Sequence, residues 1–198
     1  MNPKMMQKIE SRKNEISDVA FRLFVLNGVG DTSIRDISNE LGISIGALYH
    51  YFKSKQDIID SIATKPTRNL SHLQDYYMSL GNIKPTEALK KCIAYYLTMA
   101  DESKNLTLFL DREYRSISPE IRLIMDNISN NLLRFFEQLI SEGVRHGEFK
   151  SQYSKLAATL IFAVTHQWAS DRLRYQDKAN INEFATIMAD LIVGAILV

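Results

Sequence analysis

Cysteine is nearly absent from this chain, and its scarcity narrows the possible chemistry. Cys92 is the only cysteine, so an intrachain disulfide is excluded, and a thiolate metal site lacks the companion residues it needs. A lone cysteine suits a reducing cytoplasm, where we expect the protein to reside. Its expected role is that of a small buried side chain.

Long hydrophobic runs are also missing. The most apolar stretch, residues 184–198, is interrupted by Asp190 and falls short of the roughly twenty residues that a membrane span needs. The N-terminal sequence MNPKMMQKIESRKNEIS lacks the apolar core of a signal peptide and resembles a charged arm. We therefore expect no membrane association and no export, and interpret the apolar C-terminal stretch as a buried interface helix.

Neither sign of charge dominates. The net charge of the 198 residues is +1, and residues 1–55 carry eight Lys or Arg against six Asp or Glu. This balance argues against nonspecific coating of nucleic acid and favours a few positioned contacts. The hydrophobic content of 45% is enough for a substantial core in a small two-domain protein.

What the chain does contain is helical periodicity. Apolar residues recur at intervals of three and four, and no segment alternates as a β-strand would. The sequence therefore predicts an all-α fold of about nine helices. Pro66 is expected to kink or interrupt a helix, and the last two helices are expected at about 153–174 and 181–197.

The most informative stretch is residues 32–58, TSIRDISNELGISIGALYHYFKSKQDI. Ser33 and Asp36 have the spacing of a capping box, so a helix is expected to begin there. Gly42 supplies the left-handed residue that ends this helix, and Ser44 is placed to cap the next one. Two short helices joined in this way form a helix-turn-helix, which indicates DNA binding.

The second short helix is expected to read the DNA. Its outward residues are Gly46, Ala47, Tyr49 and His50. Small residues let the backbone approach base pairs closely, while hydroxyl and imidazole groups can donate to phosphates or base edges. Ser54 and Asp57 repeat the capping spacing and open a third helix. Its positive N-terminal end, reinforced by Lys53 and Lys55, suits a phosphate.

The motifs TSIRDIS, LGIS, GALY and YFKSK resemble, in order and spacing, the DNA-binding domain of the tetracycline-repressor-like (TetR) family. The family commonly has His and Phe just before the basic loop, where this chain has Tyr51 and Phe52, with the histidine one place earlier as His50. The resemblance implies a helix-turn-helix DNA-binding domain at 1–55 and a ligand-binding and dimerisation domain at 56–198.

The motif and the resemblance together assign the DNA contacts. The expected DNA-binding residues are Thr32, Ser33, Arg35, Ser44, Ile45, Gly46, Ala47, Tyr49, His50, Lys53 and Lys55. Two of them have plainer interpretations, Tyr49 as a packing aromatic and His50 as a solvated side chain. A helical hairpin that packs and binds nothing is the alternative to the motif as a whole.

The last two helices mix large apolar residues with small ones on more than one stripe. This pattern is expected if each helix contacts both its own core and a symmetry partner in a four-helix bundle, and a purely intrachain core is the alternative. The resemblance implies a homodimer through these two helices. Its recognition helices would meet successive major grooves of a near-palindromic operator, about 34–36 Å apart.

The resemblance further implies a small-molecule effector whose binding shifts the heads so that DNA is released. The expected ligand-binding residues are Tyr95, Tyr96, Met99, Phe109, Arg112, Arg115, Met125 and Trp168. Aromatic and sulfur groups suit an apolar cavity, and each of them taken alone also fits an ordinary core. No cofactor is expected.

Residues 109–122, FLDREYRSISPEIR, resemble the corresponding region of family members that regulate lipid breakdown and respond to acyl-CoA thioesters. Arg112, Arg115 and Arg122 would then meet the CoA phosphates while the acyl chain enters an apolar cavity. A surface ion pair between Asp111 and Arg115 is the competing interpretation. An aromatic drug or dye is the competing class of effector.

Two further classes of protein compete with a regulator. His72 with Asp75, and Glu142 with His146, have helical spacings that place two metal ligands on one face. Each pair lacks a third ligand, so hydrogen-bonded pairs are the better interpretation and neither an enzyme nor a metal site is expected. A helical protein-interaction module is the other class. The sequence favours a cytoplasmic, dimeric, ligand-responsive transcriptional repressor.

Overall fold

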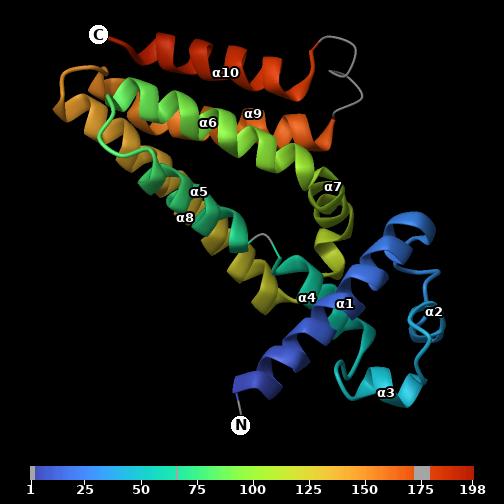
Figure 1. Ribbon diagram of the computed structural model, residues 1–198. Coiled ribbons are helices and arrows are strands. Elements are labelled where there is room, and N and C mark those ends of the chain that lie inside the picture. Colours follow the sequence, from blue (N-terminus) through green and yellow to red (C-terminus); the bar gives the residue numbers. More distant parts are fainter. Residues whose placement is uncertain (1–2, 66, 172–178) are drawn as a thin grey trace. The chain divides into compact units, whose positions relative to one another are not determined.

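The computed structural model describes residues 3–65, 67–171 and 179–198, and over these residues the chain is predominantly α-helical (Figure 1). Ten α-helices occupy the described ranges, where about nine were expected. The all-α prediction is confirmed. The α-helices are α1 (Pro3–Asn27), α2 (Ile34–Glu40), α3 (Ile45–Tyr49), α4 (Lys55–Ala63), α5 (Thr67–Ser79), α6 (Pro85–Glu102), α7 (Lys104–Glu113), α8 (Pro119–Arg145), α9 (Ser154–Ser170) and α10 (Ile181–Ile196), with short 3₁₀ helices η1 (Tyr114–Ser116) and η2 (Ser151–Tyr153).

The described residues pack as two compact units. The first unit contains those up to Lys65 together with Phe109–Met125, and the second contains residues 67–108 and Asp126–Val198. We call Phe109–Met125 the clasp segment, because it belongs to the first unit although it comes from the second half of the chain. This packing division differs from the functional division at residues 55/56 expected from the sequence.

The core of the first unit forms between α1 and α4. Ile16, Ala20 and Phe24 are fully buried and lie four residues apart, so they form one stripe along α1. The α4 residues Ile58, Ile59, Ile62 and Ala63 are buried as well. The hydroxyls of Ser17 and Ser61 lie 3.0 Å apart and share a hydrogen bond. The two helices thus form a firm support for α2 and α3.

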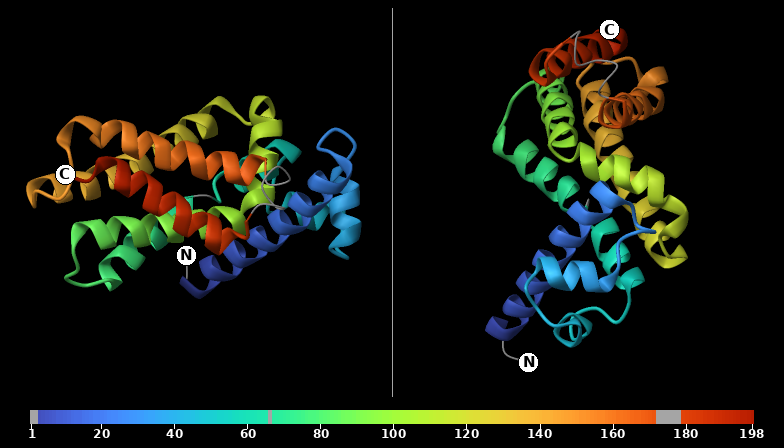
Figure 2. Two further views of the ribbon diagram at one scale, coloured as in Figure 1. Left: turned by 90° about the horizontal axis from the view of Figure 1, so that it is seen from above. Right: turned by 90° about the vertical axis from the view of Figure 1, so that its right-hand side faces the viewer.

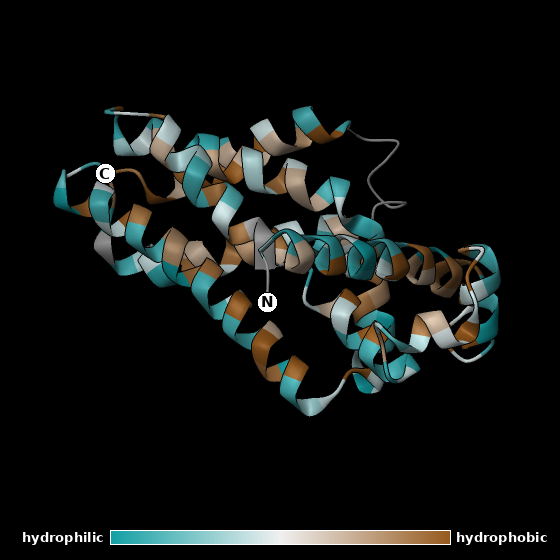
Figure 3. Ribbon diagram, turned by 60° about the horizontal axis from the view of Figure 1, so that its bottom comes forward, coloured by the Kyte–Doolittle hydropathy of each residue, from teal (hydrophilic) through white to brown (hydrophobic). Residues whose placement is uncertain are grey.

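The second unit is built around α6, which packs against α5, α9 and α10. The chain's only tryptophan, Trp168, is buried in this unit. Its ring stacks on Phe184 at 4.2 Å, and its Nε1 donates to Asp101 Oδ1 at 3.0 Å. The paired helices α9 and α10 can be followed in Figure 2. Figure 3 shows apolar and polar bands alternating along the ribbons, as expected of amphipathic helices.

Three expectations about particular segments can be compared with the structure. Helix α9 ends at Ser170, and the expected extension to residue 174 lies outside the described residues, as does Pro66. None of the helices in the described ranges is long and apolar enough to cross a membrane. Cys92 is buried as expected, and burial raises the pKa of its thiol to about 12.

Candidate nucleic-acid interface

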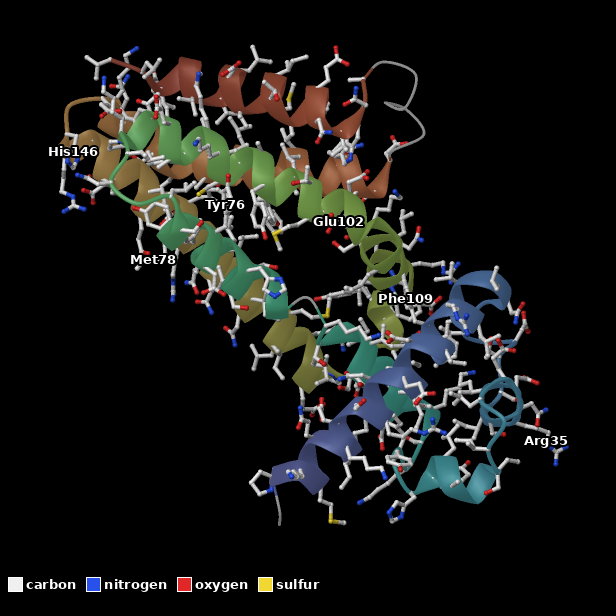
Figure 4. All side chains as sticks on the ribbon, in the orientation of Figure 1. Arg35, Tyr76, Met78, Glu102, Phe109 and His146 are labelled. Carbon is white, nitrogen blue, oxygen red and sulfur yellow. The ribbon has the colours of Figure 1, made fainter. Side chains whose placement is uncertain are left out.

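Helix α2 begins with the predicted capping box. The Ser33 amide donates to Asp36 Oδ2 at 2.8 Å, and the Asp36 amide donates to Ser33 Oγ at 3.2 Å. The hydrogen bond from the Ser33 hydroxyl lowers the pKa of the Asp36 carboxyl. Ile37 is fully buried and fixes α2 on the first unit, whereas Arg35 is exposed and projects away from the helix (Figure 4).

The turn and α3 also follow the prediction. Gly42 adopts a φ of +64°, and the Ile43 amide donates to the Ser38 carbonyl at 3.0 Å, which closes the turn. Ser44 Oγ then accepts the Ala47 amide at 3.1 Å and caps α3. Leu48 is the buried residue of α3. Four residues around it are exposed: Gly46, Ala47, Tyr49 and His50.

Gly46 is not required by the internal packing of the first unit. A Cβ built at this position meets no atom closer than Ser44 Oγ at 4.0 Å, and the backbone of Gly46 is not in the left-handed region. Glycine inside a helix costs about 0.5–1 kcal/mol relative to alanine. The fold therefore gives no reason for this glycine, and the open space beside it remains available to a bound molecule.

The N-terminal end of α4 is capped as the sequence predicts. The Asp57 amide donates to Ser54 Oγ at 3.1 Å, and the Lys53 amide donates to Asp57 Oδ2 at 2.9 Å. The Ser54 hydroxyl, which donates to Asp57 Oδ1 at 2.7 Å, is the main cause of the lowered pKa of Asp57. These two amides are thus already occupied. A phosphate here would rely on side chains such as Lys53, which is exposed.

Three of the expected DNA-binding residues are buried or half-buried. Thr32 is 1% exposed, and its hydroxyl donates to the Gly28 carbonyl at 2.8 Å. Its side chain thus closes the loop before α2, and the DNA contact expected for Thr32 stays a prediction. Ile45 and Lys55 are half-buried, and the Lys55 ammonium lies 5.9 Å from the centroid of the Phe24 ring.

The clasp segment completes the core of the first unit. Phe109 is 2% exposed, with its ring 5.4 Å from that of Phe21 and 6.1 Å from that of Phe24. Ile117 is buried as well. The guanidinium of Arg112 donates to the Phe24 carbonyl at 3.0 Å. Phe109, expected to line an effector cavity, is therefore placed in a core against α1, because its ring fills the space beside two α1 aromatics.

Two hydrogen bonds attach the clasp segment to α4. Gln56 Nε2 donates to the Ser116 carbonyl at 2.8 Å, and the Ser118 amide donates to Asp60 Oδ1 at 3.1 Å. The side chains of Gln56 and Asp60 are themselves linked at 2.9 Å. Sequence reasoning missed these residues, because polar side chains at exposed helical positions carry no mark of a partner about sixty residues away.

The arginines expected to bind CoA phosphates also lie in the clasp segment. Besides its bond to the α1 carbonyl, Arg112 donates through Nε to Glu113 Oε1 at 3.0 Å, and about half of its side chain is exposed. Arg115 is exposed. The Arg122 guanidinium lies 5.5 Å from the centroid of the Tyr114 ring. Met125, another expected ligand residue, is half-buried.

The other expected ligand residues belong to the second unit. Tyr95 stacks on Tyr76 at 4.2 Å, while Tyr96 packs 5.6 Å from Phe136, and burial raises the pKa of the Tyr96 hydroxyl. Met99 is half-buried. With the buried Trp168 already described, these side chains form an aromatic interior.

A groove of about 540 Å³ lies between α5 and α8 of the second unit. Its lining residues are Gln74, Tyr77, Met78, Phe135, Gln138, Leu139, Glu142 and Arg145. Tyr77 and Phe135 meet edge to face with centroids 5.9 Å apart, and Met78 is 77% exposed (Figure 4). Its volume is in the range of small-molecule sites. None of these residues is among the eight ligand-binding residues expected from the sequence.

One of the residue pairs considered as metal ligands, Glu142 with His146, is engaged in other contacts. His146 Nδ1 lies 2.9 Å from the Glu142 carbonyl, and the Glu142 carboxylate pairs with both His146 and Arg145. Across the described ranges, no three His, Cys, Asp or Glu side chains come together as metal ligands would.

A capped helix-turn-helix on a compact helical unit, followed by a larger helical unit with an aromatic interior, defines a DNA-binding transcriptional regulator of the helix-turn-helix class. The family model for bacterial regulatory proteins of the tetR family matches residues 16–62. The model for the tetracyclin repressor-like C-terminal domain matches residues 82–195. The chain belongs to the TetR family, whose matched members are transcriptional regulators rather than enzymes.

Individual relatives match almost the whole chain. The fatty acid metabolism regulator protein of Bacillus subtilis (strain 168) is 22% identical over 193 residues, which is 96% of this chain and 98% of that protein. The crystal structure of FadR from Bacillus subtilis in complex with stearoyl-CoA has a TM-score of 0.71 at 22% identity and covers 90% of this chain and 96% of that one. AibR, solved with isovaleryl coenzyme A and operator DNA, has a TM-score of 0.71 at 18% identity, covering 91% and 97%.

Proposed function

We propose that this regulator is a cytoplasmic homodimeric repressor that binds a near-palindromic operator through α2, α3 and the start of α4, and that a small apolar effector, an acyl-CoA, releases it. The observation that carries the DNA-binding part is the outer face of α3, where glycine, alanine, tyrosine and histidine are exposed around one buried leucine. Such a face allows close approach to base edges.

The effector part of the proposal is supported by the relatives. One is a fatty acid metabolism regulator, and two solved relatives hold a CoA thioester, stearoyl-CoA in one and isovaleryl coenzyme A in the other. In this chain, the exposed side chain of Arg115 suits a CoA phosphate, and the half-exposed Arg112 lies in the same segment. The acyl chain of such an effector would be buried against apolar side chains.

The dimer part is supported by apolar residues exposed on the last two helices. Leu156 and Leu160 lie four residues apart on α9, and Ile187 and Leu191 lie four apart on α10. Residues at this spacing share a helix face, so each helix presents an apolar stripe. A second copy of the chain would bury these stripes in a four-helix bundle.

An aromatic drug or dye is the second candidate effector. The groove between α5 and α8 favours it, because tyrosine and phenylalanine rings line it beside two glutamine amides. A flat ligand could stack there and accept hydrogen bonds from the amides. A helical protein-interaction module is the less favoured function, and no described feature other than exposed apolar side chains supports it.

The DNA-reading part is tested by Gly46→Ala. Because the space beside Gly46 is open and alanine is the better helix former, the variant is expected to fold at least as stably as the wild type. Its operator affinity is nevertheless expected to fall by at least about tenfold, since the added methyl occupies the surface that approaches the bases.

Gly30→Ala is the matched control, because Gly30 also has open space around it and lies in the first unit outside the helix-turn-helix. Fluorescence anisotropy gives the affinity and thermal unfolding gives the stability. Equal operator affinity for the two alanine variants would remove α3 from the interface, whatever the stability.

The effector part is tested on DNA from immediately upstream of the protein's own coding region, at fixed salt, by titrating long-chain acyl-CoA. Release by acyl-CoA and not by free CoA is the expected result. Specific binding that ignores acyl-CoA but responds to rhodamine 6G would replace the effector with the aromatic class. The ligand is followed without DNA through the fluorescence of Trp168, the chain's only tryptophan.

A further inference from the structure

The start of α4, by which we mean residues 53–57, lies in the proposed DNA-binding surface but outside the core of the first unit. The buried residues of α4 begin at Ile58, whereas residues 53–57 are exposed or half-buried. The capping bonds among Lys53, Ser54 and Asp57 are internal to this segment. Helix ends with few buried contacts open most readily. Contacts with other elements are therefore needed to hold the start of α4 in one position.

The start of α4 is joined directly to α3. The Phe52 amide donates to the carbonyl of Leu48, the buried residue of α3, at 3.1 Å. The next residue, Lys53, is exposed, and its amide donates to Asp57 Oδ2. Hydrogen bonds at consecutive residues thus link α3 to the start of α4, and Lys53 lies between the two helices. An exposed lysine there suits a backbone phosphate beside the bases approached by α3.

Gln56 links the start of α4 to the clasp segment. Its Nε2 donates to the Ser116 carbonyl at 2.8 Å and to Asp60 Oδ1 at 2.9 Å, so the side-chain amide is held from two sides. The same Asp60 oxygen accepts the Ser118 amide at 3.1 Å. The Ser118 carbonyl accepts the Arg122 amide at 3.0 Å, so Ser118 lies at the beginning of α8. Gln56 and Asp60 together thus bind both ends of the short stretch 116–118.

We propose that Gln56 and Asp60 are positioning residues for operator binding. The stretch that they bind is itself fixed, because Ile117 between the two serines is 2% exposed. Through it they hold the start of α4 so that Lys53 meets a phosphate, and they need not touch DNA themselves. The inference rests on the proposed DNA-binding function.

The first test replaces Gln56 with alanine in the full chain. Gln56→Ala removes both hydrogen bonds without changing the charge, and alanine is a good helix former. Because Gln56 is exposed, the variant is expected to match the wild type closely in thermal unfolding. Its operator affinity, measured by anisotropy, is expected to fall about tenfold, which corresponds to about threefold in each head of a dimer.

The dependence of log affinity on log salt shows whether Gln56 acts through Lys53. Lys53→Gln should make this slope shallower by about 0.9 for each phosphate no longer neutralised, hence by about 2 over two heads. Gln56→Ala should shift the slope toward the same value although it removes no charge. The double variant should bind little more weakly than Lys53→Gln alone, because both changes affect one contact.

Variants of Asp60 separate hydrogen bonding from charge. Removing a carboxylate from a DNA-binding unit strengthens binding by electrostatics alone. Asp60→Ala is nevertheless expected to weaken it, since the Ser118 amide and Gln56 lose their acceptor. Asp60→Asn keeps an acceptor oxygen and should bind at least as tightly as the wild type. The matched control is Asp18→Ala, which removes an exposed carboxylate of the first unit that pairs with Lys65 instead of the clasp segment and should not weaken binding.

Unchanged operator affinity and salt slope in Gln56→Ala, while the wild type binds specifically, overturn this inference and leave the proposed function standing. A double variant whose loss equals the product of the two single losses also overturns it, because Gln56 would then act independently of Lys53. Equal affinity of Asp60→Ala and Asp60→Asn has the same consequence, because only the charge would then matter. Failure of the wild-type protein to bind any duplex removes the proposed function and this inference together.

Discussion

Phe109→Ala is expected to damage the first unit, although residue 109 lies far along the chain from the helix-turn-helix. The side chain is 2% exposed and its ring contacts those of Phe21 and Phe24. Truncating a buried phenylalanine costs about 3–5 kcal/mol, from reduced burial and from the cavity left behind. For a unit of this size, that cost lowers the melting temperature by roughly 12 °C or more.

The location of the damage is the decisive observation. Hydrogen exchange followed by mass spectrometry should show faster exchange in α1 and α4 of the variant, because both helices belong to the destabilised core. Exchange in α6 and α10, which form the second unit, should change little. Leu123→Ala is the control, since Leu123 belongs to the same clasp segment but is 62% exposed.

One pattern of results would refute the placement of Phe109 in the core of the first unit. If Phe109 lined an effector cavity instead of supporting α1, the alanine variant would lose acyl-CoA affinity while exchange in α1 and α4 stayed at the wild-type rate. The Trp168 fluorescence titration measures that affinity without DNA.

Two further predictions concern single contacts. Gly143→Ala should cost about 1–3 kcal/mol in thermal unfolding, because its Cβ would overlap the Phe149 ring, whereas Gly194→Ala meets no atom within 4 Å and should cost little. Asp57→Asn tests a pH dependence: the Ser54 hydroxyl lowers the folded-state pKa of Asp57, so its carboxylate stabilises the protein above the unfolded pKa near 3.8. That stability is lost as the pH falls through the folded-state value. The melting temperatures of wild type and Asp57→Asn should therefore differ by a constant amount well above pH 3.8 and converge as the pH falls below it, and a difference that does not change with pH would contradict this assignment.

The parts of the first unit that could be predicted from the sequence are those fixed by near neighbours. Ser33, Ser44 and Ser54 each cap a helix by accepting a hydrogen bond from the amide of the residue three places later. Both groups therefore lie within one short stretch of sequence, where the cap can be predicted. The turn at Gly42 could be predicted because a left-handed backbone conformation strongly favours glycine. Local rules were sufficient for the helix-turn-helix.

The clasp segment could not be predicted, because its contacts join residues distant in sequence. Arg112 and Phe24 are separated by 88 positions. The sequence around Arg112 does not distinguish an arginine that donates to a backbone carbonyl from one that binds a phosphate. Packing between residues distant in sequence determines which partner each clasp side chain contacts, and helical periodicity carries no information about these partners.

The clasp segment also bears on how a signal reaches the DNA-binding surface. Helices α7 and α8 are each continuous across the division at residues 108/109 and 125/126, so each belongs partly to both units. A hydrogen bond such as that between Gln56 and the Ser116 carbonyl contributes about 1 kcal/mol, and allosteric coupling typically amounts to about 1–3 kcal/mol. The loss of two or three such contacts would therefore change the free energy of the first unit by an amount comparable with a typical coupling free energy. If the proposed effector acts through this segment, it needs only to favour a state of the first unit in which the clasp contacts to α1 and α4 are weaker.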